Sequence, residues 1–121
     1  MTKTALIVDD SVSMRQLVAF TLKQAGFQVI EGGNGKEALD RVKGQKVELV
    51  ITDLNMPIMD GISLVKELRA KPDFKFTPIL LLTTESQDTK KQEGRAAGAT
   101  GWIVKPFQPD ALLKVVAKVV P

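Results

Sequence analysis

The sequence predicts a doubly wound α/β domain, in which five parallel strands form one sheet between two layers of helices. Three observations favour this fold class. Short apolar runs alternate five times with segments long enough for crossover helices over the 121 residues. Several runs are almost continuously apolar, as strands buried on both faces are. Polar and acidic residues follow the runs, at the edge where open parallel sheets bind ligands.

The five predicted strands are short. Their apolar runs are Ala5–Val8, Phe27–Ile30, Val47–Ile51, Pro78–Leu82 and Trp102–Val104. The first, third and fourth lack the alternation of polar and apolar residues that an antiparallel sheet with one wet face would show. The pattern therefore indicates a parallel sheet covered on both sides.

Helix signals lie between the strands. Ser11 or Ser13 can cap the first helix, and Gly26 stands where a C-terminal glycine belongs. Its predicted core-facing stripe consists of Met14, Leu17, Val18 and Leu22. The second, third and fifth helices are expected to begin near Asn34-Gly35, Gly61 and Pro109.

The predicted fourth helix, from Asp88 to Ala97, has no large apolar residue. It also contains Gly94, which costs about 1 kcal/mol relative to alanine in a helix. We therefore expect this helix to be loosely packed.

The composition excludes several classes of function. The chain has no cysteine, which suits a reducing cytoplasm, and no histidine, so it has no imidazole base, imidazole metal ligand or phosphohistidine of its own. The N-terminal apolar run is too short for a secretory signal or a membrane span. The net charge of +3 comes from lysines spread along the chain, with one small cluster at Lys90, Lys91 and Arg95, which disfavours nucleic-acid binding.

Polar residues at the strand ends form a candidate site. Asp9 and Asp10 follow the first strand, Asp53 the third, Thr83 the fourth and Lys105 the fifth. If the strand order is 2-1-3-4-5, the order reverses between strands one and three, where the carboxylates would meet. Carboxylates so close repel one another, and Mg²⁺ is the natural ion to relieve that repulsion. A carboxylate can also accept a phosphoryl group, with a lysine to neutralise charge.

Each of these residues taken singly has a structural interpretation. Asp9 and Asp10 could cap a helix, and Asp53 could start a turn. Thr83 could be an ordinary β-branched strand residue, and Lys105 could be a solvated strand end. Their arrival at one edge of one sheet favours the functional interpretation.

Five motifs carry a resemblance to a known family. They read Ile7-Val8-Asp9-Asp10-Ser11, Asp53-Leu54-Asn55-Met56-Pro57-Ile58-Met59-Asp60-Gly61, Leu82-Thr83-Thr84, Ala97-Gly98-Ala99 and Val104-Lys105-Pro106-Phe107. With them, the chain resembles the receiver domains of two-component response regulators, closest in form to single-domain chemotaxis regulators of the CheY kind. The resemblance covers about Thr4 to Val120 and implies a flavodoxin-like, three-layer αβα fold with strand order 2-1-3-4-5. It also implies that residues 1–121 are one receiver domain.

The resemblance implies a role for each site residue. Asp53 would accept the phosphoryl group from a histidine kinase, and Lys105, ahead of a cis Lys105-Pro106 bond, would pair with a phosphoryl oxygen. Asp10 and Asp53 would bind Mg²⁺ directly with the backbone carbonyl of Asn55, and Asp9 through water. The remaining implied roles are a switch formed by Thr83 and Trp102 and a phosphoryl lifetime tuned by Asn55 and Glu85.

This chain departs from the family pattern at three places. Trp102 stands where Tyr or Phe is more usual, so its inward swing competes with simple packing at the sheet edge. Thr84 replaces a common alanine, and the fourth helix lacks apolar residues. A basic surface there would favour an acidic partner, or would simply be solvated. Its residues are Lys90, Lys91, Arg95, Lys114 and Lys118.

The favoured function is a phosphorylation switch that catalyses only its own phosphorylation and dephosphorylation. Expected partners are a histidine kinase, an output protein such as a flagellar motor component, and a phosphatase; we expect a monomer with no nucleic-acid partner and no membrane insertion. Phosphorelay intermediate and phosphate sink remain alternatives. An aspartyl phosphatase would show the motif Asp-x-Asp, but this chain has Asn55 at the second aspartate position. A flavin protein would need a phosphate-binding loop after strand one, where this chain has two aspartates. A vestigial binding module would not keep the complete set of acidic, threonine and lysine residues.

Overall fold

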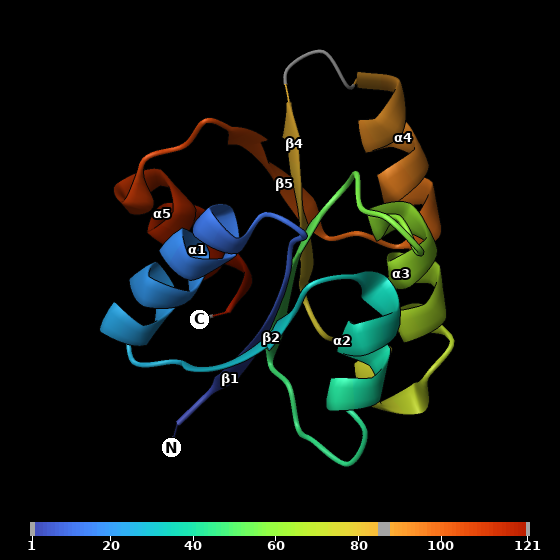
Figure 1. The fold of residues 1–121 in the computed structure, drawn as a ribbon, viewed down its shortest axis with the longest axis horizontal. Coiled ribbons are helices and arrows are strands. Elements are labelled where there is room, and N and C mark those ends of the chain that lie inside the picture. Colours follow the sequence, from blue (N-terminus) through green and yellow to red (C-terminus); the bar gives the residue numbers. More distant parts are fainter. Residues whose placement is uncertain (1, 85–87, 121) are drawn as a thin grey trace.

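The structure is a computed structural model that describes residues 2–84 and 88–120. Its five strands form one parallel sheet in the order β2-β1-β3-β4-β5 (Figure 1). The strands are β1 (Thr4–Val8), β2 (Gln28–Gly32), β3 (Leu49–Asp53), β4 (Ile79–Thr84) and β5 (Gly101–Lys105). The predicted fold class and strand order are confirmed.

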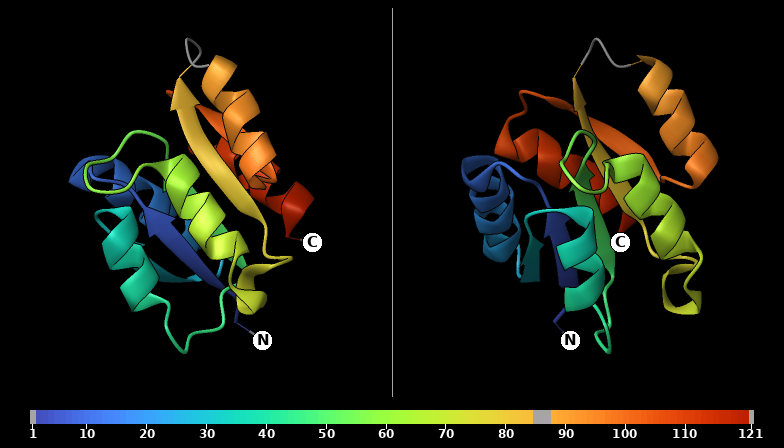
Figure 2. Two further views of the ribbon diagram at one scale, coloured as in Figure 1. Left: turned by 90° about the vertical axis from the view of Figure 1, so that its right-hand side faces the viewer. Right: turned by 45° about the vertical axis from the view of Figure 1, so that its right-hand side comes forward.

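Helices cover both faces of the sheet. They are α1 (Val12–Gln24), α2 (Gly35–Arg41), α3 (Gly61–Arg69), α4 (Asp88–Ala97) and α5 (Pro109–Val119), with a 3₁₀ turn η1 (Pro72–Phe74) after α3. One face carries α1 and α5 and the other carries α2, α3 and α4 (Figures 1 and 2). Each face buries its own apolar cluster, so strand residues alternate between two cores.

The alternation is clearest in β1. Leu6 and Val8 point into the cluster under α2 and α3, while Ala5 and Ile7 point into the cluster under α1 and α5. All four side chains are fully buried. Burial on both faces explains why this strand reads as a continuous apolar run in the sequence.

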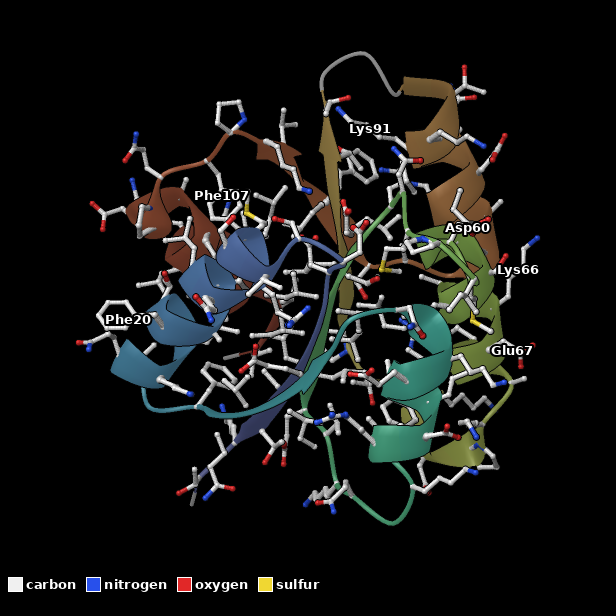
Figure 3. All side chains as sticks on the ribbon, viewed as in Figure 1. Phe20, Asp60, Lys66, Glu67, Lys91 and Phe107 are labelled. Atoms are coloured by element: carbon white, nitrogen blue, oxygen red, sulfur yellow. The ribbon has the colours of Figure 1, made fainter. Side chains whose placement is uncertain are left out.

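Helix α1 begins at the cap that Ser11 provides, whose Oγ accepts a hydrogen bond from the Met14 N–H at 3.3 Å. The predicted burial of Leu17 is wrong, because this side chain is 39% exposed. Each residue of a helix is rotated by about 100° from the one before it. Because the buried face is centred on Val18 and Leu22, Leu17 lies at the edge of that face. The outward side of the same helix carries Phe20, which points away from the sheet (Figure 3).

The expectation that α4 is loosely packed is wrong at Gly94. This residue is buried, and a Cβ placed on it would collide with Cδ1 of Leu81 in β4. At Gly94 the backbone of α4 therefore lies close to the Leu81 side chain and leaves no room for a side chain of its own. Beyond the helix, the Arg69 Nε donates a hydrogen bond to the Gly98 carbonyl at 2.9 Å, which ties the end of α4 to α3.

Candidate functional site

Four neighbouring strands deliver the predicted site residues to one edge of the sheet. Asp9 directly follows β1, while Asp53, Thr83 and Lys105 lie at the carboxyl ends of β3, β4 and β5. Asp9, Asp10 and Asp53 each offer a carboxylate oxygen, and these oxygens lie within 4.8 Å of one another. The predicted convergence of the three carboxylates is confirmed.

Asp53 is held on one of its two carboxylate oxygens. Its Oδ1 accepts hydrogen bonds from Lys105 Nζ at 2.8 Å and from the Leu54 N–H at 2.9 Å. Within the described residues, Oδ2 accepts no hydrogen bond. The side chain is 12% exposed, so one oxygen is anchored and the other is left to react or to bind an ion.

Lys105 serves two carboxylates at once. Besides its bond to Asp53, its Nζ lies 3.6 Å from Asp9 Oδ2. The Lys105-Pro106 peptide bond is cis, as predicted. The lysine therefore partly neutralises an acidic cluster that has no other basic side chain bonded to its carboxylates among the residues described.

Asp9 is completely buried, and its two oxygens differ. Oδ1 accepts a hydrogen bond from the Ser11 N–H at 2.9 Å, whereas Oδ2 has no hydrogen-bond partner in the described part of the chain. Burial raises the pKa of the Asp9 carboxyl above its usual value. The Ser11 N–H and the charge on Lys105 lower this pKa, and Asp53 and Asp10 raise it further.

Thr83 contributes a hydroxyl that lacks a partner. Its side chain is buried, and its Oγ1 makes no hydrogen bond to any residue of the described ranges. Leaving a buried hydroxyl unpaired costs roughly 1–3 kcal/mol, so a group that binds at this edge can gain a donor that the folded chain does not use.

The loop between β3 and α3 is folded back onto Asp53. The Gly61 N–H donates a hydrogen bond to the Leu54 carbonyl at 2.8 Å, and a Cβ on Gly61 would collide with the Asp53 carbonyl. At its apex, Ile58 has a φ of 71°, and the Met59 N–H bonds the Pro57 carbonyl across it at 2.7 Å. Asn55 lies exposed in this loop, and Glu85 lies outside the described residues.

Trp102 is half-buried on β5 and packs against the cluster under α3. Two cations of α4 lie over its ring: Arg95 Cζ at 5.0 Å and Lys91 Nζ at 5.7 Å from the ring centroid. Lys91 extends from α4 towards the strands (Figure 3). The tryptophan is therefore covered by charged side chains.

Comparison with known protein families identifies the family of the chain. A family model described as "Response regulator receiver domain" matches residues 5–117. The chain belongs to this family. The receiver domain is 41% identical over 109 residues to a "Chemotaxis protein CheY homolog" of Campylobacter jejuni, covering 88% of this chain and 84% of that protein.

Further relatives of this receiver domain carry similar names. A "Chemotaxis protein CheY1" of Helicobacter pylori is 40% identical, with 88% of each chain covered. The solved structure of Vibrio cholerae chemotaxis protein CheY4 is 49% identical with a TM-score of 0.94, covering 98% of this chain and 99% of that chain. The receiver domain is thus a two-component signalling protein whose homologues suggest chemotaxis, in a family of generally non-enzymatic proteins.

Arg15 lies beside the site, although the sequence patterns do not predict it there. Arg15 of α1 donates a hydrogen bond from Nη1 to the Asp9 carbonyl at 2.7 Å and from Nε to Glu31 Oε1 at 3.2 Å. No signal in the sequence distinguishes this arginine from a surface residue of the helix.

Within the described residues, no helix combines the length and the apolar character that crossing a membrane requires.

Proposed function

We propose that the chain is a phosphorylation switch of a two-component system, acting as a single receiver domain over residues 1–121 in the cytoplasm. A histidine kinase donates a phosphoryl group to Asp53, and the surface of α4, β5 and α5 then changes to control an output protein in chemotaxis. The observation that carries the proposal is Asp53 itself. One of its oxygens is fixed by Lys105 at 2.8 Å and the other is left unbonded by the described residues, beside two more carboxylates.

The donor set fits Mg²⁺. All three clustered side chains offer oxygen, Asp10 is exposed to solvent, and the buried Asp9 Oδ2 has no hydrogen-bond donor in the described part of the chain. Mg²⁺ prefers oxygen ligands from one or two carboxylates and keeps several waters. We assign Asp10, Asp53 and the Asn55 carbonyl as direct ligands and Asp9 as a ligand through water. A bound Mg²⁺ would neutralise charge on the phosphoryl oxygens.

A distant receiver domain offers a parallel for the metal. The receiver domain of a sensor histidine kinase from Pseudomonas aeruginosa was solved with a magnesium ion coordinated in its active-site cleft. That protein is 22% identical to this chain, a likeness that concerns the fold alone. The proposal for this chain therefore depends on its own carboxylates.

The transfer step follows from the geometry of Asp53. Its Oδ2 attacks the phosphorus of a phosphohistidine, an O–P bond forms, and the P–N bond breaks with its electron pair going to the imidazole nitrogen. Lys105 stays beside the transferred group, where its ammonium pairs with a phosphoryl oxygen. The unpaired hydroxyl of Thr83 donates to another phosphoryl oxygen, which gives this buried group a partner.

The proposed output surface is basic. Lys90, Arg95, Lys114 and Lys118 are exposed on α4 and α5, and Lys91 is half-buried beside Trp102. A positive surface favours an acidic partner such as a flagellar motor component or a phosphatase. Movement of Thr83 towards the phosphoryl group would let Trp102 leave the two cations of α4 and turn inward. The polar side chain of Asn55, with that of Glu85, would then orient a water that ends the signal.

The proposal is tested by labelling with a small phosphodonor. Incubation with acetyl phosphate and Mg²⁺ is expected to add one phosphoryl group, measured as a mass increase, and the change Asp53→Asn is expected to abolish it. Asp60→Asn is the matched control, because Asp60 is an exposed acid in the same loop that only caps α3, accepting the Ser63 N–H at 2.7 Å.

Trp102 gives a second readout of the same experiment, because it is the only tryptophan. Beryllofluoride with Mg²⁺ is expected to change its fluorescence in the parent protein and not in the Asp53→Asn variant. An equal response in both proteins would contradict the switch. Steady hydrolysis of diverse phosphoesters at enzyme-like rates would favour a phosphatase instead.

A further inference from the structure

We propose that Arg15 and Glu31 form a clamp that positions the metal-binding carboxylates by fixing the peptide between Asp9 and Asp10. The inference rests on the proposed Mg²⁺ site and adds to it two residues that do not touch the ion. Arg15 comes from α1 and Glu31 from β2, so the clamp joins two elements next to the strand that delivers the acids (Figure 1).

The two contacts of Arg15 differ in length, and both are partly shielded from water. Nη1 donates to the Asp9 carbonyl at 2.7 Å, and Nε donates to Glu31 Oε1 at 3.2 Å. The Arg15 side chain is 19% exposed and that of Glu31 35%. Hydrogen bonds from a charged donor are roughly twice as strong as neutral ones, so the guanidinium fixes the carbonyl it meets.

That carbonyl has a particular importance, because it belongs to the peptide that joins Asp9 to Asp10. The orientation of this peptide plane sets the direction in which the Asp10 side chain leaves the backbone. In the described ranges, the Asp10 carboxylate makes no hydrogen bond or ion pair. Its direction therefore depends on the backbone, which the Asp9 N–H also holds through the Gly32 carbonyl at 3.1 Å.

Glu31 holds Arg15 in place and balances its charge. Glu31 pairs with Ile7 in the register of β1 and β2, and Ile7 lies two positions before Asp9 in the chain. Without Glu31, the Arg15 guanidinium would lose one of its two anchors. The loss of Glu31 would also leave the positive charge of Arg15 uncompensated beside a site for a divalent cation.

For the removal of Arg15, the clamp and simple electrostatics predict opposite changes in Mg²⁺ affinity. Removing a positive charge near the carboxylates favours Mg²⁺ by Coulomb's law. Removing the clamp disfavours Mg²⁺, because this ion demands near-ideal octahedral geometry and loses affinity when its ligands are poorly oriented. Residues that orient metal ligands typically account for roughly 10–100-fold in affinity. A contact through the backbone is expected at the low end of that range.

The experiment measures the Mg²⁺ dissociation constant of the full chain by calorimetry, with the melting temperature of the metal-free protein in parallel. Arg15→Met keeps the aliphatic stem and removes the donors, and it is expected to weaken Mg²⁺ binding roughly tenfold. Glu31→Gln is expected to weaken it by a smaller factor, and the double variant to match Arg15→Met alone. Arg41→Met, which removes an exposed helix ion pair with Glu37, is the control and should leave Mg²⁺ affinity unchanged.

Mg²⁺ binding by Arg15→Met that equals or exceeds that of the parent would overturn the clamp and leave the proposed function intact. A parent protein that does not bind Mg²⁺ would overturn both. A lower melting temperature with unchanged Mg²⁺ affinity would mean that Arg15 is only structural, which also overturns the clamp. If Arg15→Met does not fold, Arg15→Lys decides alone, because it keeps the positive charge and loses the fork that holds both contacts: weaker Mg²⁺ binding supports the clamp and unchanged binding refutes it.

Discussion

Asp9 carries an unfavourable charge, because it is buried beside Asp53 and Asp10 and only partly compensated by Lys105. Its raised pKa means that the native state binds a proton more readily than the unfolded chain does. Stability therefore falls as the pH rises from the usual pKa of an aspartate through the raised native value. Above that range the ionised carboxylate opposes folding unless a cation is bound.

The change Asp9→Asn should stabilise the metal-free protein, because it removes this charge and keeps the shape. The free energy of unfolding at pH 7 is expected to rise, measured by urea denaturation in EDTA. The advantage over the parent should grow as the pH rises through the titration of Asp9 and shrink in saturating Mg²⁺. A parent protein as stable as the variant at every pH would contradict this account.

Ile58 is strained at the apex of the loop that follows Asp53. It has a φ of 71° although it is β-branched, and it is 76% exposed, so little burial compensates for the strain. The left-handed region costs an ordinary residue roughly 1–2 kcal/mol. Asparagine tolerates it better, because its short polar side chain can hydrogen-bond locally.

Ile58→Asn is therefore expected to raise the free energy of unfolding by roughly 0.5–1 kcal/mol, measured by urea denaturation. Ile58→Ala is the control, because it removes the exposed side chain but keeps a Cβ at positive φ, and it should gain less. If the alanine variant gained as much as the asparagine variant, backbone strain would not be the cause.

At the scale of the element, α4 depends on a glycine for its position. Helix propensity favours alanine at Gly94 by about 1 kcal/mol, yet a Cβ there collides with the buried Leu81. Packing should outweigh propensity, because the core around β4 is closed and overpacking a closed core costs roughly 1–3 kcal/mol.

Gly94→Ala is therefore expected to lower the free energy of unfolding by about 1 kcal/mol or more. The reverse substitution at an exposed position of the same helix, Ala96→Gly, should cost about 1 kcal/mol from propensity alone. Adding Leu81→Val to Gly94→Ala should recover part of the loss by making room. A stabilising Gly94→Ala would show that α4 lies farther from the sheet than the structure places it.

At the scale of the molecule, the features that depend on strand order can be predicted from the sequence. Parallel strands buried on both faces leave a continuous apolar signature, and the residues at their carboxyl ends lie at the same edge. For that reason the sequence alone is enough to place Asp53, Thr83 and Lys105 together. The roles given to them are predictions that the chemical tests above address.

Features that depend on distances between elements cannot be predicted in this way. Apolar periodicity does not fix the exact rotation of a helix, so it places Leu17 in the core although the side chain is partly exposed. Gly94 suggests loose packing in the sequence, whereas its lack of a side chain brings α4 close to β4. Arg15 and the cations over Trp102 act across elements that are far apart in the chain, and only the fold reveals them.

The ion pair between Lys105 and Asp53 also sets the valence of the ion that suits the site. When Asp9, Asp10 and Asp53 are all ionised, three carboxylates and one ammonium leave two negative charges, which a divalent cation cancels and a monovalent cation does not. On the proposed function, a phosphoryl group would add roughly one further negative charge, so the phosphorylated site would no longer be electroneutral. Hydrolysis would restore neutrality, and the charge balance that suits a divalent cation would therefore also favour loss of the signal.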